Sequence, residues 1–128
     1  MTMTILVAED EAIIALDLCE TVEEAGYEIE GPHGDASSAI AASNETRPDL
    51  AILDISLDDG NVFDLAQELA NADVPIIFHS GVLAHKEVEE RFPGAVTLAK
   101  PCPPAEMLGA VNNALGHGIG NGIGKANP

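Results

Sequence analysis

The stretch "LAILDISLDDG", residues 50–60, decides the fold. Its first four residues are all apolar, as expected for a strand that is covered on both faces in a parallel sheet. Asp54 follows directly, and Asp58 and Asp59 come just before a glycine. An idle charge at the end of a buried strand is costly, whereas acids in a turn are readily solvated. We therefore interpret Asp54 as a functional residue and Asp58 and Asp59 as loop residues.

Short aliphatic runs alternate with helical patterns along the rest of the chain. The runs that predict strands are residues 4–8, 27–31, 50–54, 75–79 and 95–99. The patterns that predict helices are residues 11–25, 35–45, 61–71, 84–91 and a segment that begins near Pro103 and Pro104. This alternation predicts an α/β fold, a doubly wound five-stranded parallel sheet of order 2-1-3-4-5 with five helices. The run at 27–31 alternates in polarity, so we place it at an edge.

Two of the predicted helices are amphipathic. The expected buried face of the first consists of Ile14, Leu18, Val22 and Ala25. Asp10 is expected to cap the start of this helix, and Gly26 to end it. The expected buried face of the last consists of Leu108, Val111 and Leu115.

A chain of 128 residues fits one domain with a real core, which we place at residues 1–115. Residues 116–128, "GHGIGNGIGKANP", predict a flexible glycine-rich tail. The two cysteines, Cys19 and Cys102, form neither a disulfide framework nor a zinc pattern. Without a basic leader or an apolar run of roughly 20 residues, we expect a cytoplasmic protein that does not enter a membrane.

The charge of the chain limits its partners. Its formal net charge of -17 argues against nucleic acid and anionic membrane surfaces, because both would be repelled. Residues 1–74 contain 18 acids and one base, whereas residues 75–128 contain four of each. An anion that binds this protein would therefore rely on the second half of the chain.

Polar residues follow four of the predicted strands. They are Glu9, Asp10 and Glu11, then Asp54, Ser80 and Lys100. Neighbouring strands lie only ~4.8 Å apart, so these side chains can converge at one edge of the sheet. Carboxylates that are brought together repel one another, which raises a pKa or requires a cation.

An oxygen-only ligand set without His or Cys suits Mg²⁺, which uses one or two carboxylates and keeps several waters. We predict that Glu9, Asp10 and Asp54 bind Mg²⁺, with a backbone carbonyl near Ser56 as a further ligand. A carboxylate can also attack phosphorus and form an acyl phosphate. Asp54 would be that nucleophile, with Lys100 and the hydroxyl of Ser80 to neutralise and bind the phosphoryl oxygens.

With these residues in place, the chain resembles the receiver domain of two-component response regulators over residues 3–115. The resemblance is carried by the acidic pair in "VAEDEAI", the Asp in "PDLAILDISL", the hydroxyl residue in "FHSG" and the Lys in "LAKP". It implies the flavodoxin-like receiver fold and a cis peptide between Lys100 and Pro101.

The resemblance implies that Asp54 accepts a phosphoryl group from a phosphohistidine of a histidine kinase or phosphotransfer protein, with Mg²⁺ as cofactor. The protein would be a phosphoacceptor switch that assists its own phosphorylation and dephosphorylation, rather than an enzyme. It would act as a phosphorelay shuttle, a phosphate sink or a protein-binding switch. A downstream protein would bind the face formed by residues 84–91, 95–99 and the last helix.

The stretch "FHSGV", residues 78–82, further resembles a receiver subfamily with a Phe-Ala-Thr-Gly-hydrophobic signature that is rich in single-domain regulators. His79 departs from the Ala of that signature. Thr97 stands where receivers usually have an aromatic switch residue, and Cys102 stands where many have Phe. The usual aromatic switch is therefore not expected here.

Two other functions remain open at the level of sequence. A pseudo-receiver would bind partners without phosphorylation, but the complete set of two acids, Asp, Ser and Lys argues against it. An aspartyl-phosphate phosphohydrolase commonly carries a second acid two residues after its nucleophile, where this chain has Ser56.

His79 and Ser80 are neighbours on a strand and point to opposite faces, so they cannot form a nucleophile–base pair. We expect His79 to pack under a helix.

Overall fold

The computed structural model describes residues 2–57, 62–81 and 85–116. Five strands alternate with five helices, as predicted. The strands are β1 (Thr4–Ala8), β2 (Glu28–His33), β3 (Leu50–Leu53), β4 (Ile76–Ser80) and β5 (Val96–Ala99). The helices are α1 (Ala12–Glu24), α2 (Ala36–Glu45), α3 (Val62–Asn71), α4 (His85–Arg91) and α5 (Pro104–Ala114).

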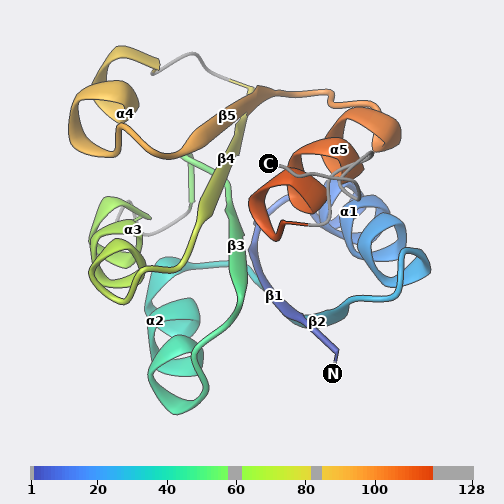
Figure 1. The fold of residues 1–128 in the computed structure, drawn as a ribbon, viewed down its shortest axis with the longest axis horizontal. Helices are drawn as coiled ribbons and strands as arrows, with labels where there is room; N and C mark the ends of the chain where they lie inside the picture. The colour runs from blue at the N-terminus through green and yellow to red at the C-terminus, as the bar shows by residue number, and fades with distance from the viewer. Residues whose placement is uncertain (1, 58–61, 82–84, 117–128) are drawn as a thin grey trace.

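The strands form one parallel sheet in the order β2-β1-β3-β4-β5, which confirms the predicted topology. Helices α1 and α5 cover one face of the sheet, and α2, α3 and α4 lie on the other (Figure 1). The strand predicted at an edge, β2, does lie at an edge. The carboxyl ends of β1 and β3 are therefore neighbours, with the connections from these two strands leaving toward opposite faces.

All four residues of the central strand β3 are buried, which explains why its sequence is entirely apolar. Leu50 and Ile52 pack into the core under α1 and α5, whereas Ala51 and Leu53 pack into the core under α2 and α3. Side chains alternate between the faces of a strand, so a strand covered on both sides needs apolar residues at every position.

The start of α1 differs from the prediction. The N-cap position is Glu11 rather than Asp10, and no side chain of the cap residue bonds a backbone N–H there. The chain leaves β1 through an acidic loop, and carboxylate oxygens of its three acids lie within 4.8 Å of one another and of a carboxylate oxygen of Asp54.

In α1 and α5, some of the buried residues lie one position along the chain from the residues predicted to be buried. The buried residues are Ala15, Leu18, Cys19 and Val22 in α1 and Met107 and Val111 in α5. Ala25 is exposed, and Ile14, Leu108 and Leu115 are only half-buried. Each helix shares a core with the sheet and also contacts the other helix, and a pattern of apolar spacing in one helix cannot show the direction of that second contact.

No helix in the described part of the chain is long and apolar enough to cross a membrane. The predictions for Asp58, Asp59, Val82 and the tail beyond Gly116 fall outside the described residues.

Candidate phosphoacceptor and metal site

The candidate site lies at the carboxyl edge of the sheet, where Glu9, Asp54 and Lys100 follow β1, β3 and β5 directly. Backbone hydrogen bonds continue past the strand ends. The amide of Asp54 donates to the carbonyl of Ala8 at 2.9 Å, and the amide of Lys100 donates to the carbonyl of Ser80 at 2.9 Å. The sheet itself therefore holds the backbone of both Asp54 and Lys100.

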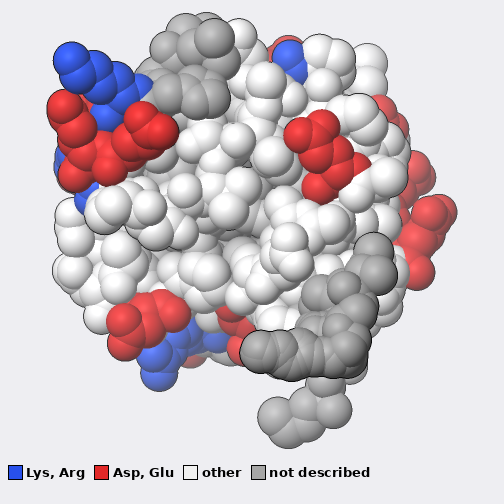
Figure 2. Space-filling view, turned by 45° about the horizontal axis from the view of Figure 1, so that its top comes forward, with Lys and Arg blue, Asp and Glu red and all other residues white. Residues whose placement is uncertain are grey.

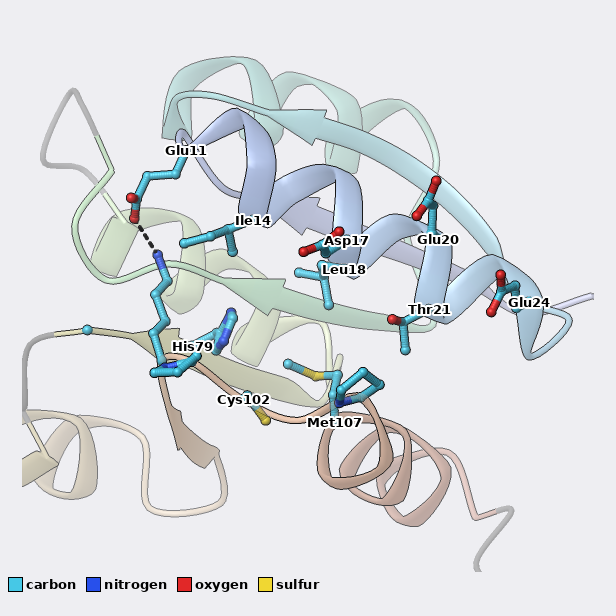
Figure 3. Close-up of a pocket in the computed structure, with 14 residues that line it drawn as sticks. Glu11, Ile14, Asp17, Leu18, Glu20, Thr21, Glu24, His79, Cys102 and Met107 are labelled. Atoms are coloured by element: carbon cyan, nitrogen blue, oxygen red, sulfur yellow. Dashed lines mark hydrogen bonds and ion pairs between the residues drawn. The ribbon is translucent and has the colours of Figure 1, made fainter.

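Lys100 brings the acids of three sequence positions together. Its Nζ lies 3.0 Å from Oδ2 of Asp54, and 2.9 Å and 3.1 Å from Oε1 and Oε2 of Glu9. It also lies 3.2 Å from Oε1 of Glu11, an ion pair drawn in Figure 3. Glu9 is only 3% exposed and Asp54 only 2%, whereas the side chain of Glu11 is largely in solvent. One cation thus serves two buried carboxylates and one at the surface.

Each buried carboxylate also accepts a backbone N–H. The amide of Ser56 donates to Oδ1 of Asp54 at 2.9 Å, and the amide of Glu11 donates to Oε2 of Glu9 at 3.1 Å. In both cases the donor is the amide two residues after the acid. Hydrogen bonds to a charged acceptor stabilise its charged form and fix its orientation.

The two buried carboxylates have different pKa values. Burial raises the pKa of Glu9 to about 7, and the neighbouring Asp54 adds to this effect. Burial acts in the same direction on Asp54, but the Ser56 amide, the Lys100 ammonium and a hydrogen bond with Glu9 outweigh it and lower its pKa. A proton that the pair shares therefore resides on Glu9 rather than on Asp54, which is ionised near neutral pH.

Lys100 remains positively charged in this environment. Burial alone would lower its pKa, but hydrogen bonds with Glu9 and Asp54 and their negative charges raise it instead. Near neutral pH the ammonium group therefore contributes a fixed positive charge.

The acids at this edge fit a hard cation. Glu9, Asp10, Glu11 and Asp54 each offer a carboxylate oxygen, and these oxygens lie within 4.8 Å of one another. They outnumber the single ammonium group, which is consistent with the raised pKa of Glu9. An oxygen-only set of this size suits Mg²⁺. A ligand role for the carbonyl of Ser56 stays a prediction.

Ser80 is the last residue of β4 and is 2% exposed. Its carbonyl accepts the Lys100 amide, so the two residues predicted to bind phosphoryl oxygens are joined through their backbones. The role of its hydroxyl stays a prediction. The peptide between Lys100 and Pro101 is cis, as the resemblance to receivers implied.

Sequence reasoning assigned no metal or phosphoryl role to Glu11, which the structure places in the same cluster. The available signal was the run of three acids after one strand. A run of this kind does not show which members turn toward the sheet edge, since that depends on where the following helix begins.

An aromatic cluster lies beside position 97, because Thr97 on β5 pairs with Phe78 on β4. Phe63, Phe78 and Phe92 form one cluster, with centroid separations of 5.7–6.2 Å. The guanidinium of Arg91 lies 4.9 Å from the ring centroid of Phe63 and 5.5 Å from that of Phe92. The end of α4 is therefore fixed to α3 and β4 by aromatic contacts, while Thr97 on β5 is half-buried.

Two kinds of comparison with known protein sequences agree with this geometry. Residues 5–112 match the family model of the response regulator receiver domain. The transcriptional regulatory protein PdtaR of Mycobacterium tuberculosis is 32% identical over 114 residues, which cover 87% of this chain and 56% of PdtaR. The phyllosphere-induced regulator PhyR of Methylorubrum extorquens is 34% identical over 118 residues, which cover 90% of this chain and 44% of PhyR. The chain thus spans about half the length of these curated relatives.

Solved structures give the same result. The receiver domain of PhyR from Erythrobacter litoralis superimposes with a TM-score of 0.79 at 26% identity, covering 89% of this chain and 90% of that domain. A response regulator receiver protein from Sinorhizobium medicae superimposes with a TM-score of 0.76 at 30% identity, covering 89% and 94% of the two chains. On the evidence of sequence, fold and the acidic edge of the sheet, this chain belongs to the response regulator receiver domain family.

Proposed function

We propose that the protein is a Mg²⁺-dependent phosphoacceptor in which Asp54 takes a phosphoryl group from a phosphohistidine of a histidine kinase or histidine phosphotransfer protein. One observation carries this proposal. Asp54 is a buried but ionised carboxylate, held by Lys100 and by the Ser56 amide at the edge of a cluster of acids. A nucleophile needs the ionised form, and burial of a charge without such a purpose is costly.

The proposed reaction is an in-line displacement at phosphorus. A carboxylate oxygen of Asp54 forms a new O–P bond, the N–P bond of the phosphohistidine breaks, and its electron pair returns to the imidazole nitrogen. Lys100 neutralises one phosphoryl oxygen through the ammonium that now contacts Asp54, and the Ser80 hydroxyl bonds another. Bound Mg²⁺, held by Glu9, Asp10 and Asp54, would neutralise further charge on the phosphoryl oxygens.

The acyl phosphate is then lost in one of two ways. Water attacks phosphorus and releases inorganic phosphate, with the protein assisting its own dephosphorylation, or a second histidine accepts the group in the reverse of the first step. The first outcome describes a sink or a timed switch, and the second a relay shuttle. The proposal includes all three uses, in a protein that acts in the cytoplasm.

We further propose that a downstream protein binds the face formed by α4, β5 and α5. On the side drawn in Figure 2, basic side chains lie next to acidic ones and border an area without charged groups. Val96 on β5 is 39% exposed, an apolar side chain that a partner could cover. These features, together with the net charge, favour a protein partner over nucleic acid.

The names of PdtaR and PhyR describe regulators, and PdtaR is described as a transcriptional one. The relatives are about twice as long as the shared region, so their regulatory outputs transfer only as proposals. We propose that this chain supplies the receiver function.

The proposal is tested by intact-mass measurement after incubation with acetyl phosphate, with and without Mg²⁺. We expect the unaltered protein to gain one phosphoryl group only when Mg²⁺ is present. Asp54→Asn should gain none, while Asp64→Asn, which changes an exposed acid on α3 in the same way, should behave like the unaltered protein. Absence of phosphoryl uptake by the unaltered protein would favour the pseudo-receiver.

A further inference from the structure

Glu11 makes a contact that the proposed reaction does not use. Its Oε1 lies 3.2 Å from Nζ of Lys100, and its side chain is 63% exposed. The pair lies at one end of a groove between α1 and α5, which both residues line (Figure 3). The backbone of Glu11 is fixed, because its amide donates to Glu9 and its carbonyl accepts the amide of Ala15. The side chain can therefore leave Lys100 without a movement of the main chain.

The N–H donors of the Lys100 ammonium are all in use among the described residues. An ammonium group carries three such donors. One donates to Oδ2 of Asp54 at 3.0 Å, one to Oε2 of Glu9 at 3.1 Å and one to Oε1 of Glu11 at 3.2 Å. A phosphoryl oxygen on Asp54 can therefore bond to this ammonium only if one of the three carboxylates gives up its hydrogen bond.

The three carboxylates differ in the cost of leaving Lys100. The side chains of Glu9 and Asp54 are only 1% and 2% exposed, so either carboxylate would lose its cation in a medium of low polarity. Glu11 would be hydrated instead, because most of its side chain already lies in solvent. An exposed ion pair is also weak. Glu11 is therefore the partner that a phosphoryl group displaces most readily.

We propose that Glu11 competes with the phosphoryl group for Lys100. In the unphosphorylated protein, its carboxylate accepts the N–H that a phosphoryl oxygen accepts after transfer to Asp54. The exchange passes one hydrogen bond from Oε1 of Glu11 to a phosphoryl oxygen, and water then hydrates the released carboxylate. Glu11 acts through Lys100 and is thus a positioning residue. This inference rests on the phosphoacceptor function proposed above, and adds to it a residue that limits how tightly the site holds the phosphoryl group.

Beryllofluoride is a suitable probe, because it is a tetrahedral anion that binds an aspartate oxygen as a phosphoryl group would. Its apparent Kd in saturating Mg²⁺ can be measured from the amide ¹H–¹⁵N NMR spectrum. We expect Glu11→Gln to lower this Kd about two- to fivefold, since a neutral amide competes less well for the ammonium. Glu20→Gln, the same change at an exposed position of α1, should leave the Kd unchanged.

Glu11→Asp separates competition for Lys100 from simple repulsion of an anion. It keeps the negative charge at the same backbone position, but its side chain is one methylene shorter and so reaches Lys100 less well. Competition predicts that Glu11→Asp, like Glu11→Gln, binds beryllofluoride more tightly than the unaltered protein does. Repulsion by the charge alone predicts no tighter binding in Glu11→Asp.

The ion pair itself can be tested without a phosphoryl analogue. Urea denaturation in EDTA measures the effect of Glu11→Gln on the equilibrium constant of unfolding, in the unaltered protein and in Lys100→Met. The substitution should favour unfolding about two- to fivefold more in the unaltered protein than in Lys100→Met, where the ammonium is absent. This measurement does not depend on whether Asp54 accepts phosphate.

An equal Kd for the unaltered protein and Glu11→Gln would overturn this inference alone, as would a Glu11→Asp variant that binds no more tightly than the unaltered protein. Equal effects of Glu11→Gln on unfolding in the two backgrounds would also overturn it. Failure of the unaltered protein to bind beryllofluoride at Asp54 would overturn the proposed phosphoacceptor function, and this inference with it.

Discussion

Lys100 is the residue on which the electrostatics of the candidate site depend. Its ammonium contacts Glu9, Glu11 and Asp54, and two of these carboxylates are almost fully buried. Breaking a buried ion pair by removing one partner is expensive, because the remaining charge is left in a medium of low polarity. The cost should be greatest above pH 7, where Glu9 is ionised as well as Asp54.

Lys100→Met should therefore lower the free energy of unfolding of the metal-free protein by roughly 3 kcal/mol at pH 8. Urea denaturation measures this loss. Lys86→Met, which removes an exposed base from α4, should change the value by less than about 0.5 kcal/mol. Mg²⁺ should recover part of the loss in Lys100→Met, since the unpaired carboxylates gain a cation. Equal effects of the two substitutions would contradict this account of the site.

Glu9 gives a dependence on pH whose sign follows from its raised pKa. Its pKa is about 7 in the folded protein, against an ordinary value of 4.5, so the folded state binds the proton more tightly. This contribution to stability is fully present below about pH 4.5 and is lost as the pH rises toward 7. Asp54 has a lowered pKa, so its opposite contribution changes only at more acidic pH.

In EDTA, the free energy of unfolding should therefore fall between pH 4.5 and 7 by an amount on the order of 1–3 kcal/mol that is attributable to Glu9. Glu9→Gln should remove this slope, because the amide does not titrate. Glu20→Gln changes an exposed acid on α1 and should keep it. Parallel curves for the unaltered protein and Glu9→Gln would show that Glu9 has no raised pKa.

For individual residues, the sequence was informative where a residue differed in polarity or charge from the residues around it. Asp54 follows four apolar residues, and Lys100 is one of five bases in the chain. The sequence could not predict the ion pair of Glu11 or the unpartnered nitrogens of His79. Both depend on side-chain directions that are set only when α1 and α5 pack on the sheet.

Among the elements, the edge strand β2 contains a position that only glycine fits. Gly31 has φ +125°, and a Cβ at that position would lie 2.7 Å from the carbonyl oxygen of Val7 and 3.0 Å from the amide nitrogen of His33. Both contacts are with backbone, so neither can be relieved by rotating a side chain. A left-handed backbone is also strained for any residue with a Cβ.

Gly31→Ala should lower the free energy of unfolding by at least about 2 kcal/mol. Gly34→Ala is the matched control, because Gly34 has no positive φ and a Cβ added there would meet nothing within 4 Å. It should change stability by less than about 1 kcal/mol. Urea denaturation of both variants makes the comparison, and a loss in Gly34→Ala as large as that in Gly31→Ala would contradict it.

Element types and order were predictable because strands and helices have different apolar periods. The predicted cap at Asp10 was wrong, since α1 begins at Ala12 and its cap position is Glu11. The buried faces of α1 and α5 were displaced by about one residue, which exchanged Leu108 for Met107. Periodicity shows that a helix has a buried side, but the angle of that side is fixed by two packing partners at once.

For the whole molecule, the net charge of -17 opposes the compact state through self-repulsion. Screening by salt should therefore raise the melting temperature of the metal-free protein. A bound divalent cation should add to this effect, because it neutralises carboxylates that are fixed close together at one sheet edge.

Increasing NaCl should raise the melting temperature by screening, and MgCl₂ at matched ionic strength should raise it further by several degrees. This excess should be reduced in Asp54→Asn and retained in Asp64→Asn, which separates a specific site from general screening. Differential scanning calorimetry measures the melting temperature in each salt. Identical melting temperatures in the two salts would contradict the proposed magnesium site.

Among the properties of the whole fold, the topology was the most predictable, because right-handed crossovers and alternating strands and helices leave few possible arrangements of the sheet. The meeting of Glu9, Asp54 and Lys100 followed from that topology, as their strands end at the same edge. The groove between α1 and α5 was not predictable, since it depends on how two helices far apart in the sequence pack against each other.

The central claim is that Asp54 itself carries the phosphoryl group. Borohydride reduces an aspartyl phosphate to homoserine, so treatment of the protein after incubation with acetyl phosphate and Mg²⁺, followed by peptide mass spectrometry, identifies the modified residue. We predict homoserine at position 54 in the unaltered protein and in Asp64→Asn. Homoserine at another acid, or a phosphoryl group that is found on a hydroxyl residue instead, would contradict the account.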